Sequence, residues 1–394
     1  MLSAELLHAI ASHPEDLSFR LVYADWLEER GELDRATCIR TECALADVPA
    51  YDYRWMTYAR WRVEHLHALP TPVLPAGLDW AVLAYHAGFP EALCASSAEV
   101  LLAHAPRLFA ASPIRSLTLK GHHAPLLLSR VLAEPWLRQV RRIEIDGGAL
   151  DRDDIARLAG CEHLGGLRSL ALRFGALTDD GAAALLWTPL VQQLDTLELG
   201  HDFFVEHGAP LAAAFRAAPP LPSLRTLEVA ANRMDPAAFA PIVEHTGLAL
   251  ARLDATDNPL GDGGWTGIAR AAQPFAHLAL GKTYPGVAGV DALADSQHTT
   301  TLRSLDVAYN RCGPKAAVAL GRARWPALEF LRLSRGKLGD DGVLALARAA
   351  TTAFPALRRA ELDGDDLSPR VAALAKAWFT STDAMLDARR DDAL

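Results

Sequence analysis

The sequence has few cysteines, lysines and aromatic residues, and it has no long uninterrupted apolar run. Its five cysteines are odd in number and scattered, without a Cys-x-x-Cys pair, which argues against a disulfide framework or a zinc site. No window approaches the ~20 consecutive apolar residues of a membrane-spanning helix. The first sixteen residues contain no basic residue, unlike a secretory signal. We therefore expect a cytoplasmic protein with no membrane partner.

Basic residues are scarce relative to acids. The 394 residues include 39 lysines and arginines against 48 acids, which gives a formal net charge of −9, and only five residues are lysine. A phosphate-binding surface needs clustered lysine and arginine, so we expect no nucleic-acid partner. The apolar fraction of 51% is enough to build a large core.

One template recurs ten times from residue 114 onward. It reads L-x-x-L-x-L-x-x-N-x-L-x-x-x-G-x-x-x-L, and successive copies start 25 to 30 residues apart. This period lies in the range of leucine-rich repeats or just above it. The fourth and sixth positions are apolar, so each copy predicts a short strand with one face in the core. The first positions are Ile114, Val140, Leu167, Leu194, Leu224, Leu250, Phe275, Leu302, Leu328 and Leu357.

Each predicted strand is followed by a turn and a helical segment. Asparagine occupies the turn position in Asn232, Asn258 and Asn310, where its amide can bond backbone groups of adjacent turns. The sequence therefore predicts an α/β fold, a horseshoe-shaped solenoid with parallel strands inside and helices outside. The length of the repeats resembles the ribonuclease-inhibitor-like branch of leucine-rich repeat proteins.

The first third of the chain has a different pattern. Residues 1–49 contain ten acids and four arginines, and they precede the repeats. Apolar residues recur at helical spacing in three segments. Residues 13–16 separate the first segment from the second, and Gly31 ends the second. This pattern predicts a small all-α module. The expected apolar positions are Leu2, Leu6 and Ile10, then Phe19, Val22 and Trp26, then Ala36, Ile39 and Cys43.

Part of the sequence of this module also resembles a known family. The run RLVYADWLEERG at residues 20–31 resembles the bacterial repeat-companion domain, a short helical module found ahead of repeats, and a weaker likeness continues at GFPE, residues 88–91. The resemblance implies an architecture and transfers no activity. We expect a helical companion domain over residues 1–49, an aromatic and proline-containing linker and solenoid cap over residues 50–113, and the repeat domain with a C-terminal helical cap over residues 114–394.

Candidate catalytic and metal-binding groups are few. Asp25, Glu28 and Glu29 lie on one predicted helix and could in principle serve as acid and base of a hydrolase, but a solvated helix face accounts for them. The histidines at residues 65–67 and 122–123 lack the spacing or the third ligand of a metal site. No phosphate-binding loop or nucleophile motif occurs. We therefore expect no enzyme activity, no metal and no cofactor.

An aromatic segment precedes the repeats, with five aromatic residues within residues 51–61. Such a segment either covers the open end of a solenoid or forms a hot spot of an interface. We favour the cap, and Trp55 and Trp61 remain candidate partner-binding residues.

The outward-facing fifth template position is acidic in six of ten copies. Glu198, Glu228 and Asp254 occupy consecutive strands, which lie ~4.8 Å apart, so their charges repel by roughly 1 kcal/mol even in water. Arginines at the second position could neutralise them on an ordinary solvated sheet. The alternative is a concave surface that binds a basic protein partner. The six acids are Glu144, Glu198, Glu228, Asp254, Asp306 and Glu361.

Together these features predict a non-enzymatic protein–protein interaction scaffold whose concave repeat face binds a protein partner with a basic surface. By fold analogy, such a protein serves as the recognition or inhibitory subunit of a separately encoded effector. The alternative function is regulation of a small GTPase, as in GTPase-activating members of the same repeat branch.

Overall fold

The computed structural model describes residues 2–46, 48, 53–65, 73–81, 85–121, 124–200, 208–362 and 367–379. The chain forms two compact units. The first contains residues 1–181 and 188–194, and the second contains residues 182–187 and 195–394. Each unit is described by itself below.

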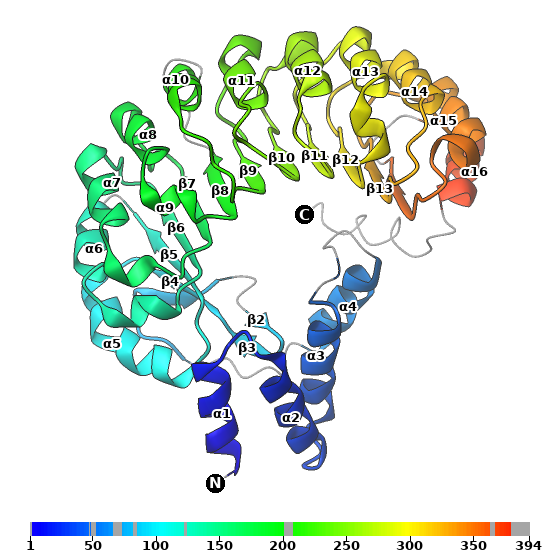
Figure 1. The fold of residues 1–394 in the computed structure, drawn as a ribbon. Coiled ribbons are helices and arrows are strands. Elements are labelled where there is room, and N and C mark those ends of the chain that lie inside the picture. Colours follow the sequence, from blue (N-terminus) through cyan, green and yellow to red (C-terminus); the bar gives the residue numbers. More distant parts are fainter. Residues whose placement is uncertain are drawn as a thin grey trace. The chain divides into compact units, whose positions relative to one another are not determined.

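The first unit begins with four helices (Figure 1). Asp16 caps the second helix by accepting a hydrogen bond from the Ser18 amide, and Gly31 follows this helix with a φ of +80°. The first three helices form where the sequence predicts them, whereas the fourth lies in the segment that the sequence analysis describes only as a linker and cap. Their bounds are α1 Leu2–Ser12, α2 Leu17–Glu28, α3 Leu33–Ala44 and α4 Tyr53–Glu64.

The buried face of α2 differs from the predicted one. Val22 is half exposed to solvent, whereas Arg20, Tyr23, Ala24 and Leu27 are buried. The difference arises because the prediction counted only apolar residues, whereas the charged Arg20 is fully buried. Its guanidinium donates to the carbonyl oxygens of His86 at 2.7 Å and Pro14 at 3.1 Å and forms an ion pair with Glu91. Buried charges are tolerated when they are paired in this way.

A two-stranded hairpin completes the core of this helical module. It consists of β2 (Tyr85–His86) and β3 (Phe89–Pro90), and the Phe89 ring packs with Tyr23, Leu27 and Ile39. Gly88 lies between these strands with a φ of +76°, close against Ile39. The two sequence stretches that resemble the companion family, residues 20–31 and 88–91, therefore meet in one core.

Strand and helix alternate through the rest of the first unit. β1 pairs antiparallel with β4, and β4, β5, β6 and β7 pair in parallel order. β4 and α5 form a further strand–helix pair ahead of residue 114. In this pair, Pro90 stands at the first template position in place of an apolar residue. The bounds are β1 Leu78–Trp80, β4 Ala92–Ala95, α5 Ala98–Ala111, β5 Ser116–Lys120, α6 Ala124–Val131, β6 Arg142–Asp146, α7 Arg152–Ala159, β7 Ser169–Arg173 and α9 Pro189–Gln192, while α8 Asp179–Leu185 crosses the unit boundary.

The second unit continues the same alternation, with strands on one side and helices on the other (Figure 1). β8 to β14 pair with their neighbours in parallel, as the repeat pattern predicts. The strands are β8 Thr196–Gly200, β9 Thr226–Glu228, β10 Arg252–Asp254, β11 His277–Ala279, β12 Ser304–Asp306, β13 Phe330–Arg332 and β14 Arg359–Glu361. The helices are α10 Ala209–Ala217, α11 Pro236–Val243, α12 Gly261–Arg270, α13 Val287–Ala294, α14 Gly313–Arg322, α15 Gly339–Ala353 and α16 Pro369–Phe379.

The core lies between the strands and the helices. Five leucines at the fourth template position are at most 1% exposed. This burial confirms the predicted repeat register and the leucine-rich repeat solenoid. The leucines are Leu170, Leu197, Leu227, Leu305 and Leu331.

The asparagine position forms a buried ladder across the turns. Asn258 Oδ1 accepts hydrogen bonds from the Asn232 and Met234 amides at 3.1 and 2.9 Å, and its Nδ2 donates to the Val229 carbonyl at 2.9 Å. Asn310 serves the turn before it in the same way. Each side chain thus satisfies backbone groups that the curved turn leaves without a strand partner. Among the described helices, none is both long and apolar enough to cross a membrane.

Candidate functional site

The acidic fifth-position residues of the second unit form one row. Glu198 is in register with Glu228, and Glu228 with Asp254. The row continues through Ala279 and Asp306. It lies on the face of the sheet opposite the helices, which we call the helix-free face; this is the face that the sequence predicts to be concave.

These carboxylates are less exposed than their outward position suggests. Glu198 and Glu361 are buried, at 8% and 9% exposure, and Glu228, Asp254 and Asp306 are half-buried. Glu228 leans over Gly200, because its Oε1 lies 3.1 Å from the point where a Cβ of that glycine would stand. The side chains therefore lie along the sheet, and Glu228 and Asp254 offer the most accessible carboxylates of the consecutive three.

Arginines compensate the later part of the row. The Arg332 guanidinium contacts Asp306 at 3.1 Å and Glu361 at 2.9 Å, and Arg359 also pairs with Glu361. In the first unit, Glu144 is paired with Arg142 at 2.9 Å. These ion pairs were not predicted from the sequence, although Arg332 was recognisable as a fifth-position residue with an acid in the repeat on each side.

Several second-position arginines bind the turn that precedes their own strand. Arg141, Arg168 and Arg225 donate to backbone carbonyl oxygens of the turn just before their own strand, at 2.9, 2.9 and 2.6 Å. Arg115 and Arg141 also bind an acid of the helical module, since they contact Glu15 at 3.6 and 3.2 Å. These bonds hold the turn, and Arg303, at the same template position, forms an ion pair with Glu329 at 2.8 Å.

The aromatic segment packs on the helical module. Tyr58 is buried with Cys38 and Leu45, and Trp55 and Trp61 are half-buried against that cluster. Trp55 Nε1 donates to the Val48 carbonyl at 2.8 Å. These contacts place the described aromatic side chains on α3 and not on a repeat. Tyr51 lies outside the described residues.

A buried polar cluster joins α3 to α4. Cys38 Sγ lies 2.9 Å from Tyr58 Oη, which donates to Glu42 Oε1 at 2.6 Å. Burial, followed by the Glu42 charge, raises the pKa of the Cys38 thiol to about 11. A thiol with such a pKa stays protonated and is a poor nucleophile.

Two of the three carboxylates that could suggest a hydrolase, Asp25 and Glu28, are ion-paired on an exposed surface. Arg40 contacts Asp25 at 2.7 Å and Glu28 at 2.5 Å. Arg30 stacks over the Trp26 ring at 3.9 Å. Within the described residues, no cluster of three or more histidine, cysteine, aspartate or glutamate side chains is arranged to hold a metal ion; residues 67, 122 and 123 lie outside that part of the chain.

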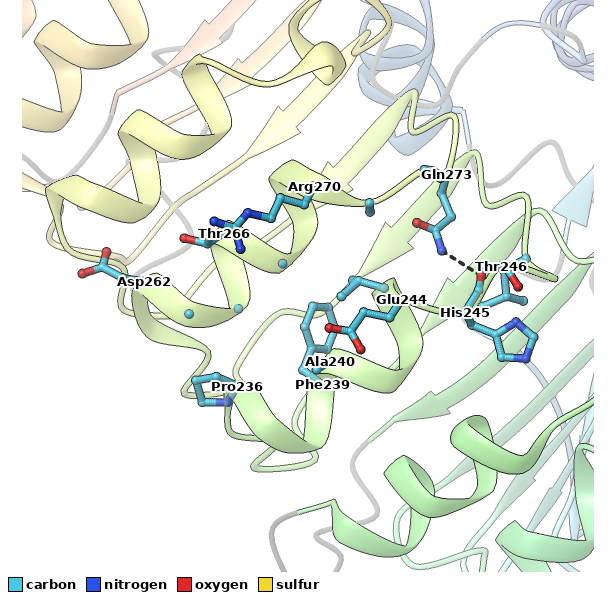
Figure 2. A pocket seen from close by; sticks show the side chains of 17 residues that line it. Pro236, Phe239, Ala240, Glu244, His245, Thr246, Asp262, Thr266, Arg270 and Gln273 are labelled. Carbon is cyan, nitrogen blue, oxygen red and sulfur yellow. Dashed lines mark hydrogen bonds between the residues drawn. The ribbon is translucent and has the colours of Figure 1, made fainter.

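A groove of about 670 Å³ lies between α11 and α12 (Figure 2). Gly263 and Gly267 let α12 approach Pro236 and Val243 of α11. Two polar side chains of the groove are bound to the backbone: Gln273 Nε2 donates to the His245 carbonyl at 3.3 Å, and Asp262 Oδ1 accepts from the Gly289 amide at 2.6 Å. We interpret the groove as a gap between neighbouring helices that small residues leave open.

Comparison with known proteins agrees with the repeat architecture. The family model described as a leucine-rich repeat matches residues 167–186, 298–321 and 326–347. No curated protein matches the chain.

Two solved structures resemble the chain at low identity. A chain in the crystal structure of the Rad7 and Elc1 complex from yeast is 16% identical, with a TM-score of 0.46, covering 92% of this chain and 94% of that one. The leucine-rich repeat-containing protein LegL7 from Legionella pneumophila is 17% identical, with a TM-score of 0.46, covering 69% of this chain and 92% of that one.

Proposed function

We propose that the protein is a non-enzymatic protein-interaction scaffold, which binds a partner with a basic surface on the helix-free face of its second unit. The observation that carries the proposal is the register of Glu198, Glu228 and Asp254 on three consecutive strands. Three carboxylates about 4.8 Å apart create a local negative potential. A lysine- or arginine-bearing partner would relieve this repulsion.

The ion pairs and the exposure of the row support a choice among its residues for the contact with a partner. Asp306 and Glu361 are already paired with Arg332, so their charge is largely compensated. Glu228 and Asp254 are half-buried and keep part of their surface accessible, whereas Glu198 is buried and would act through its charge. In this proposal Glu228 and Asp254 make the contacts. Glu144 is paired with Arg142, and Trp55 and Trp61 pack on α3, so the proposal gives these three residues no part in the contact.

The test is a pair of charge-matched variants. A partner is first recovered by affinity capture from the native host and purified. The variant Glu228→Gln with Asp254→Asn should then slow association, and the salt dependence of the association rate should flatten, because long-range attraction acts on encounter. The control, Glu244→Gln with Asp295→Asn, removes the same charge from the helix side of the same unit.

Three results would contradict the proposal. The variant Glu228→Gln with Asp254→Asn could associate with the partner as fast as the wild type does. Both variants could lose binding equally, or the partner could have an acidic surface. If partner binding by the variant Glu228→Gln with Asp254→Asn is unchanged, the helical module becomes the proposed binding site.

The proposed biological setting is a recognition or inhibitory subunit of a separately encoded effector. Regulation of a small GTPase stays the alternative prediction. The two differ in the captured partner: the alternative requires a GTP-binding protein whose hydrolysis rate rises when the chain is added.

A further inference from the structure

Three turns of the second unit are basic within an acidic chain. Residues 281–286, 308–315 and 334–339 contain five lysines and arginines and no acid, and they hold three of the chain's five lysines. The turn before them, residues 256–262, contains two aspartates and no basic residue, and residues 362–368 contain three aspartates. We call the seven cationic and aromatic residues of these turns the basic rim: Lys282, Tyr284, Tyr309, Arg311, Lys315, Arg335 and Lys337.

The three turns lie side by side where β11, β12 and β13 end. The Lys282 amide donates to the Ala308 carbonyl at 3.0 Å, and the Tyr309 amide donates to the Ser334 carbonyl at 2.8 Å. The Gly313 amide donates to the Gly336 carbonyl at 3.0 Å. These bonds extend the parallel strand pairing into the turns, so neighbouring rim residues are spaced like strands, about 4.8 Å apart.

The backbone of the turns directs the rim side chains outward. Thr283 and Asn310 lie between rim residues, and their own side chains are buried and hydrogen-bonded inward. The residues on either side of them have positive φ angles, 53° and 55° for Lys282 and Tyr284, and 62° and 51° for Tyr309 and Arg311. Because the buried ladder fixes these turns, the rim needs little ordering before it binds a ligand.

Much of the rim is exposed, and three of its five cations have no ion-pair partner in the part of the chain that the structure describes. Tyr284 is 55% exposed and Tyr309 40%, and Arg335 stacks over the Tyr309 ring at 5.3 Å. Lys282 is paired with Asp257 at 3.4 Å. Of the carboxylates in the described ranges, none is paired with Arg311, Lys315 or Arg335. The surface therefore combines positive charge with two accessible aromatic rings.

We propose that the basic rim binds a short acidic segment of a partner protein in an extended conformation. Three turns about 4.8 Å apart span roughly 10 Å, which three or four residues of extended chain at ~3.3 Å each can cover. Alternate carboxylates would meet the cations, and an apolar side chain would pack on Tyr284 or Tyr309. A long nucleic acid fits less well, because acidic turns border the rim in the sequence on both sides.

The test measures binding of a fluorescein-labelled peptide that has four glutamates and one leucine between two glycines. The full chain should bind it, and raising the salt from about 50 to about 300 mM should weaken binding several-fold. The variant Arg311→Gln with Arg335→Gln should raise Kd by about tenfold or more. The control Arg216→Gln with Arg348→Gln removes two exposed arginines from α10 and α15 and should leave Kd unchanged.

Several outcomes would overturn the proposal. The full chain could fail to bind the peptide, the glutamine version of the peptide could bind equally well, or the control variant could lose as much affinity as the rim variant. Tighter binding of a short oligothymidylate would assign the rim to nucleic acid instead. This inference is independent of the acidic row: the variant Glu228→Gln with Asp254→Asn should bind the acidic peptide at least as well as the wild type.

Discussion

Two glycines of the helical module have similar backbone angles but different surroundings. Gly31 and Gly88 have φ values of +80° and +76°, a region that residues with a Cβ avoid. A Cβ on Gly31 would meet nothing within 4 Å, whereas a Cβ on Gly88 would overlap the Ile39 side chain. Gly31 is therefore required for its conformation alone, and Gly88 also for the space that it leaves to the core.

The two glycines give a matched pair of alanine substitutions. Gly31→Ala should lower the free energy of unfolding by about 1 kcal/mol, the cost of a strained backbone. Gly88→Ala should lower it by a further 1 to 3 kcal/mol or so, because Ile39 must move in a packed core. Urea unfolding monitored by circular dichroism gives both values. Equal losses for the two variants would show that Ile39 moves away without cost.

His298 is a buried residue with a pH-dependent contribution to stability. Burial lowers its pKa below the usual value, and Nε2 lies 2.9 Å from the Ile268 carbonyl oxygen, which limits the shift. Since the unfolded chain takes up a proton more readily near pH 6.5, the contribution is complete above that pH and is lost as the pH falls toward the folded pKa.

This sign leads to a measurement. The urea concentration at the unfolding midpoint should decrease as the pH is lowered from about 7.5 to about 5.5, a range in which carboxylates remain ionised. His298→Gln keeps a side-chain donor and should reduce that decrease. The variant should still show part of the decrease, because burial, together with Arg252 and Arg303, also lowers the pKa of His277. An unchanged pH dependence in the variant would exclude His298 as its source.

At the scale of elements, the strands are only three residues long in most of the second unit, from β9 to β14. Such short strands are held by stacked leucines on one face and by the asparagine ladder at their ends. Leu227 is in register with Leu197 on one neighbour and Leu253 on the other, and all three are fully buried. Each repeat therefore depends on the core residues of its neighbours.

Leu227→Ala tests this dependence. The substitution removes buried methyl groups and leaves a cavity between adjacent repeats, so the free energy of unfolding should fall by about 2 to 5 kcal/mol. Val318→Ala, at an exposed position of α14, is a control and should change it by less than about 0.5 kcal/mol. Denaturant unfolding of the full chain measures both. A loss below about 1 kcal/mol for Leu227→Ala would show that this core layer collapses onto the cavity.

The elements differed in how far the sequence could predict them. The repeat strands were predictable because their period recurs ten times, and Asn232, Asn258 and Asn310 identified the turn. The buried face of α2 was not predictable, because two of the groups that bind the buried Arg20 side chain belong to Glu91 and His86, which lie 71 and 66 residues later in the chain. The acidic row was visible in the sequence, but the burial of Glu198 depends on neighbouring strands. The basic rim could have been found by counting charges turn by turn.

At the scale of the whole molecule, the helical module is part of a larger compact unit. Residues 1–181 belong to one unit together with residues 188–194. Arg20 and the hairpin residue Phe89 join the module to the segment that leads into β4, while Glu15 contacts Arg115 and Arg141 beside β5 and β6. The module thus shares its core and its ion pairs with residues that follow it by 60 to 130 positions or so.

Removal of the module should therefore disturb the segment that leads into the repeats. A chain that starts at residue 50 loses the partners of Phe89 and Glu91, so a buried aromatic ring and a charge paired with Arg20 become exposed. Amide hydrogen exchange should then become faster in peptides that cover residues 85–95, whereas peptides that cover β10 to β13 should exchange as in the full chain, because they belong to the other unit. Unchanged protection of residues 85–95 would mean that the helical module is a separable domain, and the contacts of Arg20 and Phe89 would then be incidental to the folding of the first repeats.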